Sequence, residues 1–159
     1  MKNKVVVVGS YNTDLTIKTK RIPRPGETVI GGKFFQGGGG KGANQAVACA
    51  RAGASVTFLA RLGNDALGDG AVKRLKEDGI ATHCIVRDDQ YPTGVAFILV
   101  EEEGENSIVV ASGANARLSP SDIERAKEEI ASAGVILLQL ECPLETVQYA
   151  IHLAHQCGT

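Results

Sequence analysis

Unbroken hydrophobic runs alternate along the chain with segments whose hydrophobic residues recur every three to four positions. The runs lie at 5–8, 56–60 and 135–140, with a weaker one at 84–86. Such runs are typical of strands buried on both faces, as in a parallel sheet covered by helices. The pattern therefore predicts an open, mainly parallel α/β sheet with helices on both faces.

The segments with helical periodicity are 43–50, 67–75, 120–130 and 144–154. Ser119 followed by Pro120 is typical of a helix start, with an N-cap and then proline at the first helical position. In the last segment we expect the hydrophobic residues to face the core; they are Leu144, Val147, Ile151 and Ala154.

Two segments depart from this alternation. Residues 15–35 contain prolines and glycine pairs among β-forming residues, and residues 94–112 are typical of a hairpin with its turn at 103–106. Both segments are predicted to be antiparallel strands that form a small sheet beside the α/β body. We find no internal repeat or linker, so residues 1–159 are expected to form one unit.

Charge and hydropathy exclude some partners. Lys and Arg number 17 and Asp and Glu 18, giving a net charge of −1, whereas nucleic-acid binding needs a basic excess. No apolar run approaches the roughly 20 residues of a membrane span, and the N-terminus is unlike a secretory signal. We therefore expect a cytoplasmic protein without nucleic-acid or membrane partners.

The densest glycine run, at residues 37–42, leads directly into a predicted helix. Glycine lets the backbone approach a ligand, and free N–H groups at a helix start favour anionic or oxygen-rich partners. Gly37, Gly39 and Gly42 also match the dinucleotide pattern G-x-G-x-x-G, but the next strand ends at Arg61 rather than at an acidic residue. Dinucleotide binding therefore stays a minor alternative.

Polar residues follow two of the predicted strands. Asn12 and Asp14 come just after the first strand, and Glu141 ends the run at 135–140. Ligands bind at this edge of open α/β sheets, and a carboxylate with an amide can hold adjacent sugar hydroxyls. The alternatives are an Asx turn at Asn12 and a simple helix-dipole role for Glu141. His152 and His155 lack a third ligand, so no metal site is expected.

Several motifs resemble the PfkB, or ribokinase-like, family of sugar kinases along the whole chain. Residues 39–46, with Gly53 and Gly63 at their spacings, match the first signature of that family. Further matches lie at 26–28, 93–96, 104–106, 113–116 and 141–145.

The resemblance implies an α/β body with a small β-sheet lid, formed here by segments of about 15–35 and 94–112. It implies that Asn12 and Asp14 hold ribose hydroxyls and that Glu141 completes the sugar site. It also implies a homodimer formed through the lids. The remaining pocket residues implied are Gly40, Lys41 and Asn44, which line the same pocket, and Ala96, Ile98 and Val110, which close over it from the lid.

The sequence also departs from that family, whose members are about twice as long. The second signature, Asp-Thr-x-Gly-Ala-Gly-Asp, supplies the catalytic base and anion hole in the family and is absent here, as is the magnesium-associated Asn-Pro-x-x-Glu. We therefore expect the sugar-binding N-terminal half of an ATP-dependent ribose kinase, truncated before its C-terminal half. The chain would hold no catalytic residue, and ATP, Mg²⁺ and K⁺ would be cofactors of the full-length family only. The alternative is a half-domain that self-associates through the lid or a free sheet edge and has no ligand.

Overall fold

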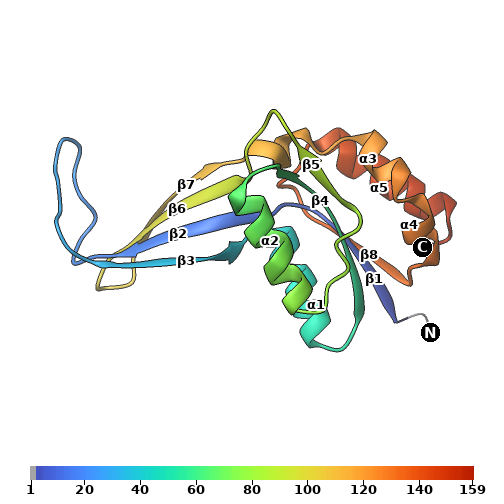
Figure 1. Ribbon diagram of the computed structural model, residues 1–159, viewed down its shortest axis with the longest axis horizontal. Helices are drawn as coiled ribbons and strands as arrows, with labels where there is room; N and C mark the ends of the chain where they lie inside the picture. The colour runs from blue at the N-terminus through green and yellow to red at the C-terminus, as the bar shows by residue number, and fades with distance from the viewer. Residues whose placement is uncertain (1–2) are drawn as a thin grey trace.

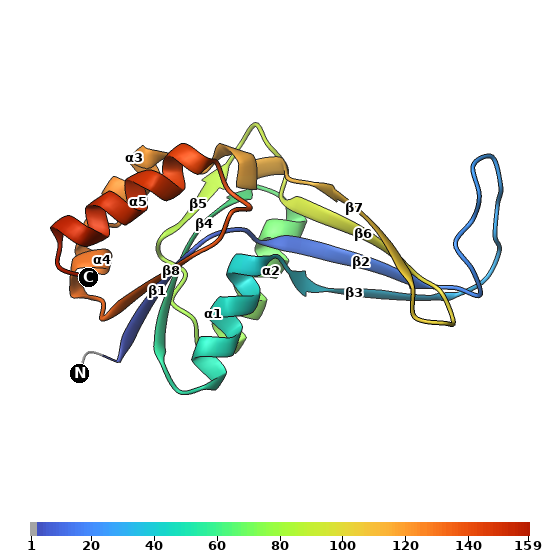
Figure 2. The ribbon, with the colours of Figure 1, turned by 180° about the vertical axis from the view of Figure 1, so that it is seen from behind.

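The computed structural model describes residues 3–159 and contains two four-stranded β-sheets (Figure 1). The first sheet is entirely parallel. Its order is β5 (Ile85–Asp88), β4 (Ser55–Gly63), β1 (Lys4–Val8) and β8 (Val135–Leu138). The second sheet extends away from the first as an arm (Figure 2). Its order is β3 (Lys33–Gly39), β2 (Asn12–Lys18), β6 (Gly94–Val100) and β7 (Asn106–Ala111).

Helices cover both faces of the first sheet, so the predicted α/β architecture is confirmed (Figure 1). Val7 of β1 packs in one core with Ala46, whereas Val6 and Val8 pack in the other core with Ile123. One face carries α1 (Lys41–Arg51) and α2 (Ala66–Glu77), and the other α3 (Pro120–Arg125), α4 (Lys127–Ser132) and α5 (Leu144–Gln156). No helix in the described range 3–159 is long and apolar enough to cross a bilayer.

The predicted start at Ser119 is confirmed by a capping box, in which Ser119 and Asp122 bond each other's backbone N–H groups. The helix predicted at 120–130 is divided at Ala126 into α3 and α4. Ile123 and Ile130 are both buried, as the periodicity indicated. A short 3₁₀ helix, η1 (Gly113–Arg117), precedes α3.

The inward face predicted for α5 is partly wrong. Leu144 is 60% exposed and Ile151 is 51% exposed. The buried face includes Thr146, whose hydroxyl donates to the carbonyl oxygen of Leu118 at 2.8 Å. This bond helps to fix the helix rotation, so two of its apolar residues face outward.

The second sheet also differs from the expectation of antiparallel strands alone. The hairpins β2–β3 and β6–β7 are antiparallel, but β2 pairs with β6 in parallel, with Asn12 opposite Gly94. Both strands leave the body in the same direction, so their contact is parallel (Figure 1). Residues 12–14 lie within β2 and residues 37–39 within β3, and therefore neither set forms a turn or loop.

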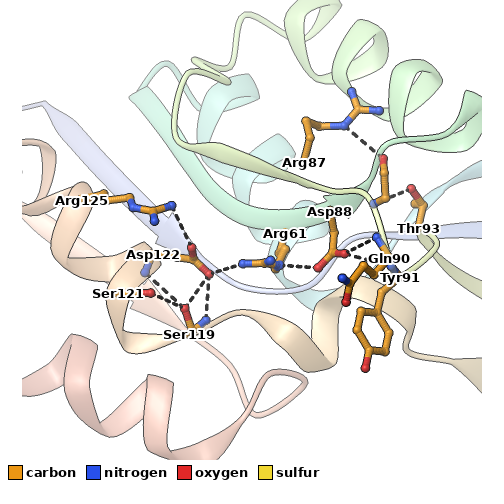
Figure 3. A network of polar contacts seen from close by, with 11 residues as sticks. Arg61, Arg87, Asp88, Gln90, Tyr91, Thr93, Ser119, Ser121, Asp122 and Arg125 are labelled. Atoms are coloured by element: carbon orange, nitrogen blue, oxygen red, sulfur yellow. Dashed lines mark hydrogen bonds and ion pairs between the residues drawn. The ribbon is translucent and has the colours of Figure 1, made fainter.

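A buried ion-pair network joins β4, β5 and α3 (Figure 3). The guanidinium of Arg61 donates from Nε to Asp88 at 2.7 Å and from Nη1 to Asp122 at 2.9 Å. The side chain of Asp88 is 5% exposed and that of Asp122 is 1% exposed. Asp88 also accepts from the backbone N–H groups of Gln90 and Tyr91. The network thereby anchors the segment that leads into β6.

Candidate functional site

The connection between β1 and β2 brings both sheets and the start of α1 together. The carbonyl oxygen of Ser10 accepts from the backbone N–H of Ala43 at 2.9 Å. A Cβ atom added at Gly42 would lie 2.7 Å from the backbone of Gly9 and Ser10. Only glycine at position 42 therefore lets the helix start lie this close to the end of β1.

Glu141 binds the N-terminus of α1. Its Oε2 accepts from the backbone N–H of Lys41 at 2.9 Å and from the Ser10 hydroxyl at 2.6 Å, and its Oε1 pairs with the Lys41 ammonium group. Burial opposes ionisation of Glu141, but these bonds from Lys41 and Ser10 outweigh it and lower the pKa of the carboxyl. Glu141 is therefore ionised at neutral pH, and protein donors already use its oxygens.

Asp14 has the opposite environment. Within the described residues 3–159, no hydrogen bond or ion pair engages its half-buried carboxylate. Burial, and secondly the negative charge of Glu141, raise the pKa of Asp14. The carboxylate lies against Gly39, where a Cβ atom would collide with it. The site therefore holds one satisfied carboxylate and one that lacks a donor.

Asn12 is held by Asn115, a residue that the sequence analysis did not single out. The Asn115 amide donates to Asn12 Oδ1 at 2.9 Å and to the carbonyl oxygen of Tyr11 at 2.8 Å, and its own oxygen accepts from the N–H of Tyr11 at 2.9 Å. Asn115 is only 2% exposed. It thus fixes the first residue of β2, and its place in the motif at 113–116 was the only signal in the sequence.

The strand register places three apolar residues on the same face as Asp14. Ala96 lies directly opposite Asp14, Val110 lies opposite Ala96, and Ile98 follows two positions later. Side chains two positions apart share a face of a sheet. Ala96 is buried and Ile98 half-buried, whereas Val110 is 51% exposed. The second sheet therefore has an apolar surface beside the Asp14 carboxylate.

The remaining pocket residues lie at the start of α1. Gly40 is the N-cap with φ of +89°, and a Cβ atom there would lie 2.9 Å from the carbonyl oxygen of Ser10. Lys41 is the first helical residue and lies beside Glu141. Asn44, one turn further along, is exposed and lines a separate cavity between α1 and α2.

The dinucleotide-binding alternative is wrong. The fingerprint requires a strand, the glycine turn and a helix within one parallel βαβ unit. Gly37 and Gly39 instead lie in β3, which is antiparallel to β2 and belongs to a different sheet from β4.

Comparisons with known proteins give the family. The family model for pfkB family carbohydrate kinases matches residues 2–159. A ribokinase of Schizosaccharomyces pombe is 42% identical over 160 residues, which cover 97% of this chain and 50% of that protein. A deoxyribokinase of Salmonella typhi is 41% identical over 154 residues, with 97% and 50% covered.

Solved structures agree with this assignment. The ribokinase of Arabidopsis thaliana, complexed with ribose and ATP, matches with a TM-score of 0.86 and 32% identity, covering 100% of this chain and 52% of that one. This chain spans about half the length of the curated relatives it matches. It belongs to the pfkB family of carbohydrate kinases.

Proposed function

We propose that this chain is the sugar-binding half of a ribokinase and that it binds D-ribose at Asp14. The observation that carries the proposal is the Asp14 carboxylate, which is half-buried and has no donor among the described residues 3–159. Partial burial raises the pKa of this carboxyl, and two donated hydroxyl hydrogens would stabilise its ionised form. Adjacent hydroxyls of a pentose supply two such donors.

The neighbouring groups support a sugar as the ligand. Ala96, Ile98 and Val110 share the face of Asp14 and suit the C–H surface of a furanose ring. In this proposal the second sheet acts as the lid. Asn12 and the N-terminal turn at Gly40 and Lys41 border the sugar, and Glu141 holds Lys41 in place.

Phosphoryl transfer by this chain alone is not part of the proposal. The second signature, Asp-Thr-x-Gly-Ala-Gly-Asp, which supplies the catalytic base and the anion hole in the family, does not occur in the sequence. Phosphoryl transfer depends on charges positioned around the transferred phosphate. Within residues 3–159, no cluster of three or more His, Cys, Asp or Glu side chains could hold a metal ion. We therefore assign ATP, Mg²⁺ and K⁺ no step here and leave them to a full-length enzyme.

Calorimetric titration tests the binding proposal. We expect saturable binding of D-ribose and weaker binding of 2-deoxyribose, which lacks one of the donated hydroxyls. We also expect no ADP above background when ribose and Mg-ATP are added together. Absence of ribose binding by a chain that melts cooperatively would refute the sugar site, and ribose-dependent ADP formation would refute the lack of catalysis.

A second candidate function is self-association through the second sheet. Its face opposite Asp14 exposes Ile17, Phe34, Phe97 and Val109, of which Phe34 is 61% and Val109 is 70% exposed. The register places these side chains together on one face. Contiguous apolar patches on a surface mark association sites. We therefore propose that two copies form a homodimer through this face.

Light scattering tests the dimer. We expect twice the mass of the chain at micromolar concentration and a monomer for Phe97→Glu. The matched control is Val135→Glu, which places a charge on a similarly exposed apolar residue of β8, the edge strand of the first sheet. A dimer lost with Val135→Glu and kept with Phe97→Glu would place the contact at the sheet edge instead.

A further inference from the structure

A cavity of about 630 Å³ lies between α1 and α2, on the side of β3 opposite Asp14. Its walls are apolar at Ala43, Val47 and Leu75. The polar residues that line it are Tyr11, Asn44, Arg74 and the ion pair of Arg51 with Asp78. This size is within the usual range of small-molecule sites, which combine apolar walls with a few convergent polar groups. The cavity plays no part in the proposed sugar site, although Asn44 borders it.

Arg74 supplies an unneutralised charge to this cavity. Its Nε and Nη2 donate to the Tyr11 hydroxyl oxygen at 3.3 and 3.1 Å. No carboxylate pairs with Arg74 among residues 3–159, because the nearby Asp78 pairs with Arg51 at 3.0 Å instead. A guanidinium has five N–H donors in a planar fork. Arg74 therefore keeps free donors and a half-buried positive charge.

Tyr11 adds a second donor at the same place. The side chain is 2% exposed and packs in the core with Ala43 and Leu75. Because its oxygen accepts from Arg74, its hydroxyl hydrogen is free for another acceptor. A Cβ atom at Gly38 would lie 3.0 Å from this hydroxyl, so the absence of a side chain at Gly38 leaves space beside it. Arg74 and Tyr11 thus converge on one space.

We propose that this cavity binds a small organic carboxylate with an apolar body. The carboxylate would receive N–H groups of Arg74 and the hydroxyl hydrogen of Tyr11, in charge-assisted hydrogen bonds that suit a planar oxyanion. The apolar body would lie against Ala43, Val47 and Leu75. A bare oxyanion such as phosphate leaves those walls uncovered, and for this reason the structure favours a carboxylate on an apolar group.

Benzoate is the probe for this site, with NMR amide shifts of the isotope-labelled chain as the readout. We expect saturable shifts at Ala43, Val47 and Leu75 at millimolar benzoate. Arg74→Met should weaken the binding by about tenfold, the loss of one charged contact worth about 1.4 kcal/mol. The matched control is Arg51→Met combined with Asp78→Asn, which removes an already neutralised ion pair from the same cavity without changing its net charge. This double variant should change the affinity by less than about twofold.

Several results would overturn the proposal. One is the absence of benzoate shifts in a chain whose spectrum is that of a folded protein. A second is equal loss of affinity in Arg74→Met and in the double variant, which would indicate nonspecific attraction. A third is stronger binding of inorganic phosphate than of benzoate. Because Arg74→Met also removes the contact with Tyr11, its melting temperature is measured, and Tyr11→Phe, which keeps the ring, should weaken benzoate binding independently.

Discussion

Arg61→Met should lower the free energy of unfolding by about 3–5 kcal/mol, as expected when one partner of a buried ion pair is removed. Arg61 pairs with both Asp88 and Asp122, whose side chains are 5% and 1% exposed, and Asp122 has a second, longer contact with Arg125 at 3.6 Å (Figure 3). Methionine fills part of the same volume, so the loss measures charge rather than packing. Urea denaturation followed by circular dichroism gives the value.

Two controls separate charge from other effects. Arg51→Met removes the surface pair with Asp78, in which Arg51 is 71% exposed, and should cost less than about 1 kcal/mol. Adding Asp88→Asn to Arg61→Met should recover part of the stability, since the amide carries no charge to bury. Equal losses for Arg61→Met and Arg51→Met would show that the network does not stabilise the fold.

The difference in unfolding free energy between the parent and Arg61→Met should depend on pH. Burial opposes ionisation of Asp88, but bonds from Arg61 and the backbone outweigh it and lower the pKa. A lowered pKa stabilises the fold above the unfolded pKa, and this stability is lost as the pH falls through the folded pKa. Without Arg61 the pKa of Asp88 is lowered less, so its ionised carboxylate contributes less stability. The difference between parent and variant should therefore be largest at neutral pH and smaller in acid.

Asp14→Asn should weaken D-ribose binding by more than about tenfold and Asp14→Ala by more than about a hundredfold. Each hydrogen bond to a charged group is worth about 1.5–3 kcal/mol, and every 1.4 kcal/mol is a factor of ten in affinity. Asparagine keeps one neutral acceptor, whereas alanine keeps none. Calorimetric titration measures both. Glu103→Ala is the matched control, because it removes an exposed carboxylate from the β6–β7 turn of the same sheet.

The melting temperature and the pH dependence of binding distinguish a loss of ribose affinity in the Asp14 variants from unfolding of the chain. Burial and then the charge of Glu141 raise the pKa of Asp14, so its ionised form destabilises the fold as the pH rises through the unfolded and folded pKa values. Asp14→Asn should therefore melt no lower than the parent at neutral pH. Ribose affinity should fall on acidification at a pH above the ordinary titration of an aspartate. Unchanged ribose affinity in Asp14→Ala would refute its role.

The fold was largely predictable because buried strands and amphipathic helices leave strong local patterns. The run at 5–8 became β1, and Ser119 began a helix. The parallel contact of β2 with β6 was not predictable, because it depends on where two hairpins leave the body rather than on their own residues. The outward position of Ile151 is also set by tertiary contacts, since its spacing fits an inward face equally well.

At the site, the sequence indicated polar residues at strand ends. The structure places Glu141 beside Lys41, and Asp14 lies within β2, close enough for the charge of Glu141 to raise its pKa. The sequence did not indicate Ser10, and it indicated Asn115 only through the motif at 113–116 and without a role. Both act by holding groups that are distant in sequence, 131 residues away for Ser10 and 104 for Asn115. Short polar residues with such roles resemble ordinary turn residues, so local pattern does not distinguish them.

The three glycines of β3 differ in how much variation they would tolerate. A side chain at Gly39 would strike Asp14, and one at Gly38 would crowd the Tyr11 hydroxyl. At Gly37, which lies directly opposite Asp14, an added Cβ atom meets nothing within 4 Å. A new side chain there would lie on the same face of the sheet as Asp14 without a steric clash. If the proposed ribose site is correct, position 37 is therefore where evolution or protein engineering could most readily change which sugar is bound.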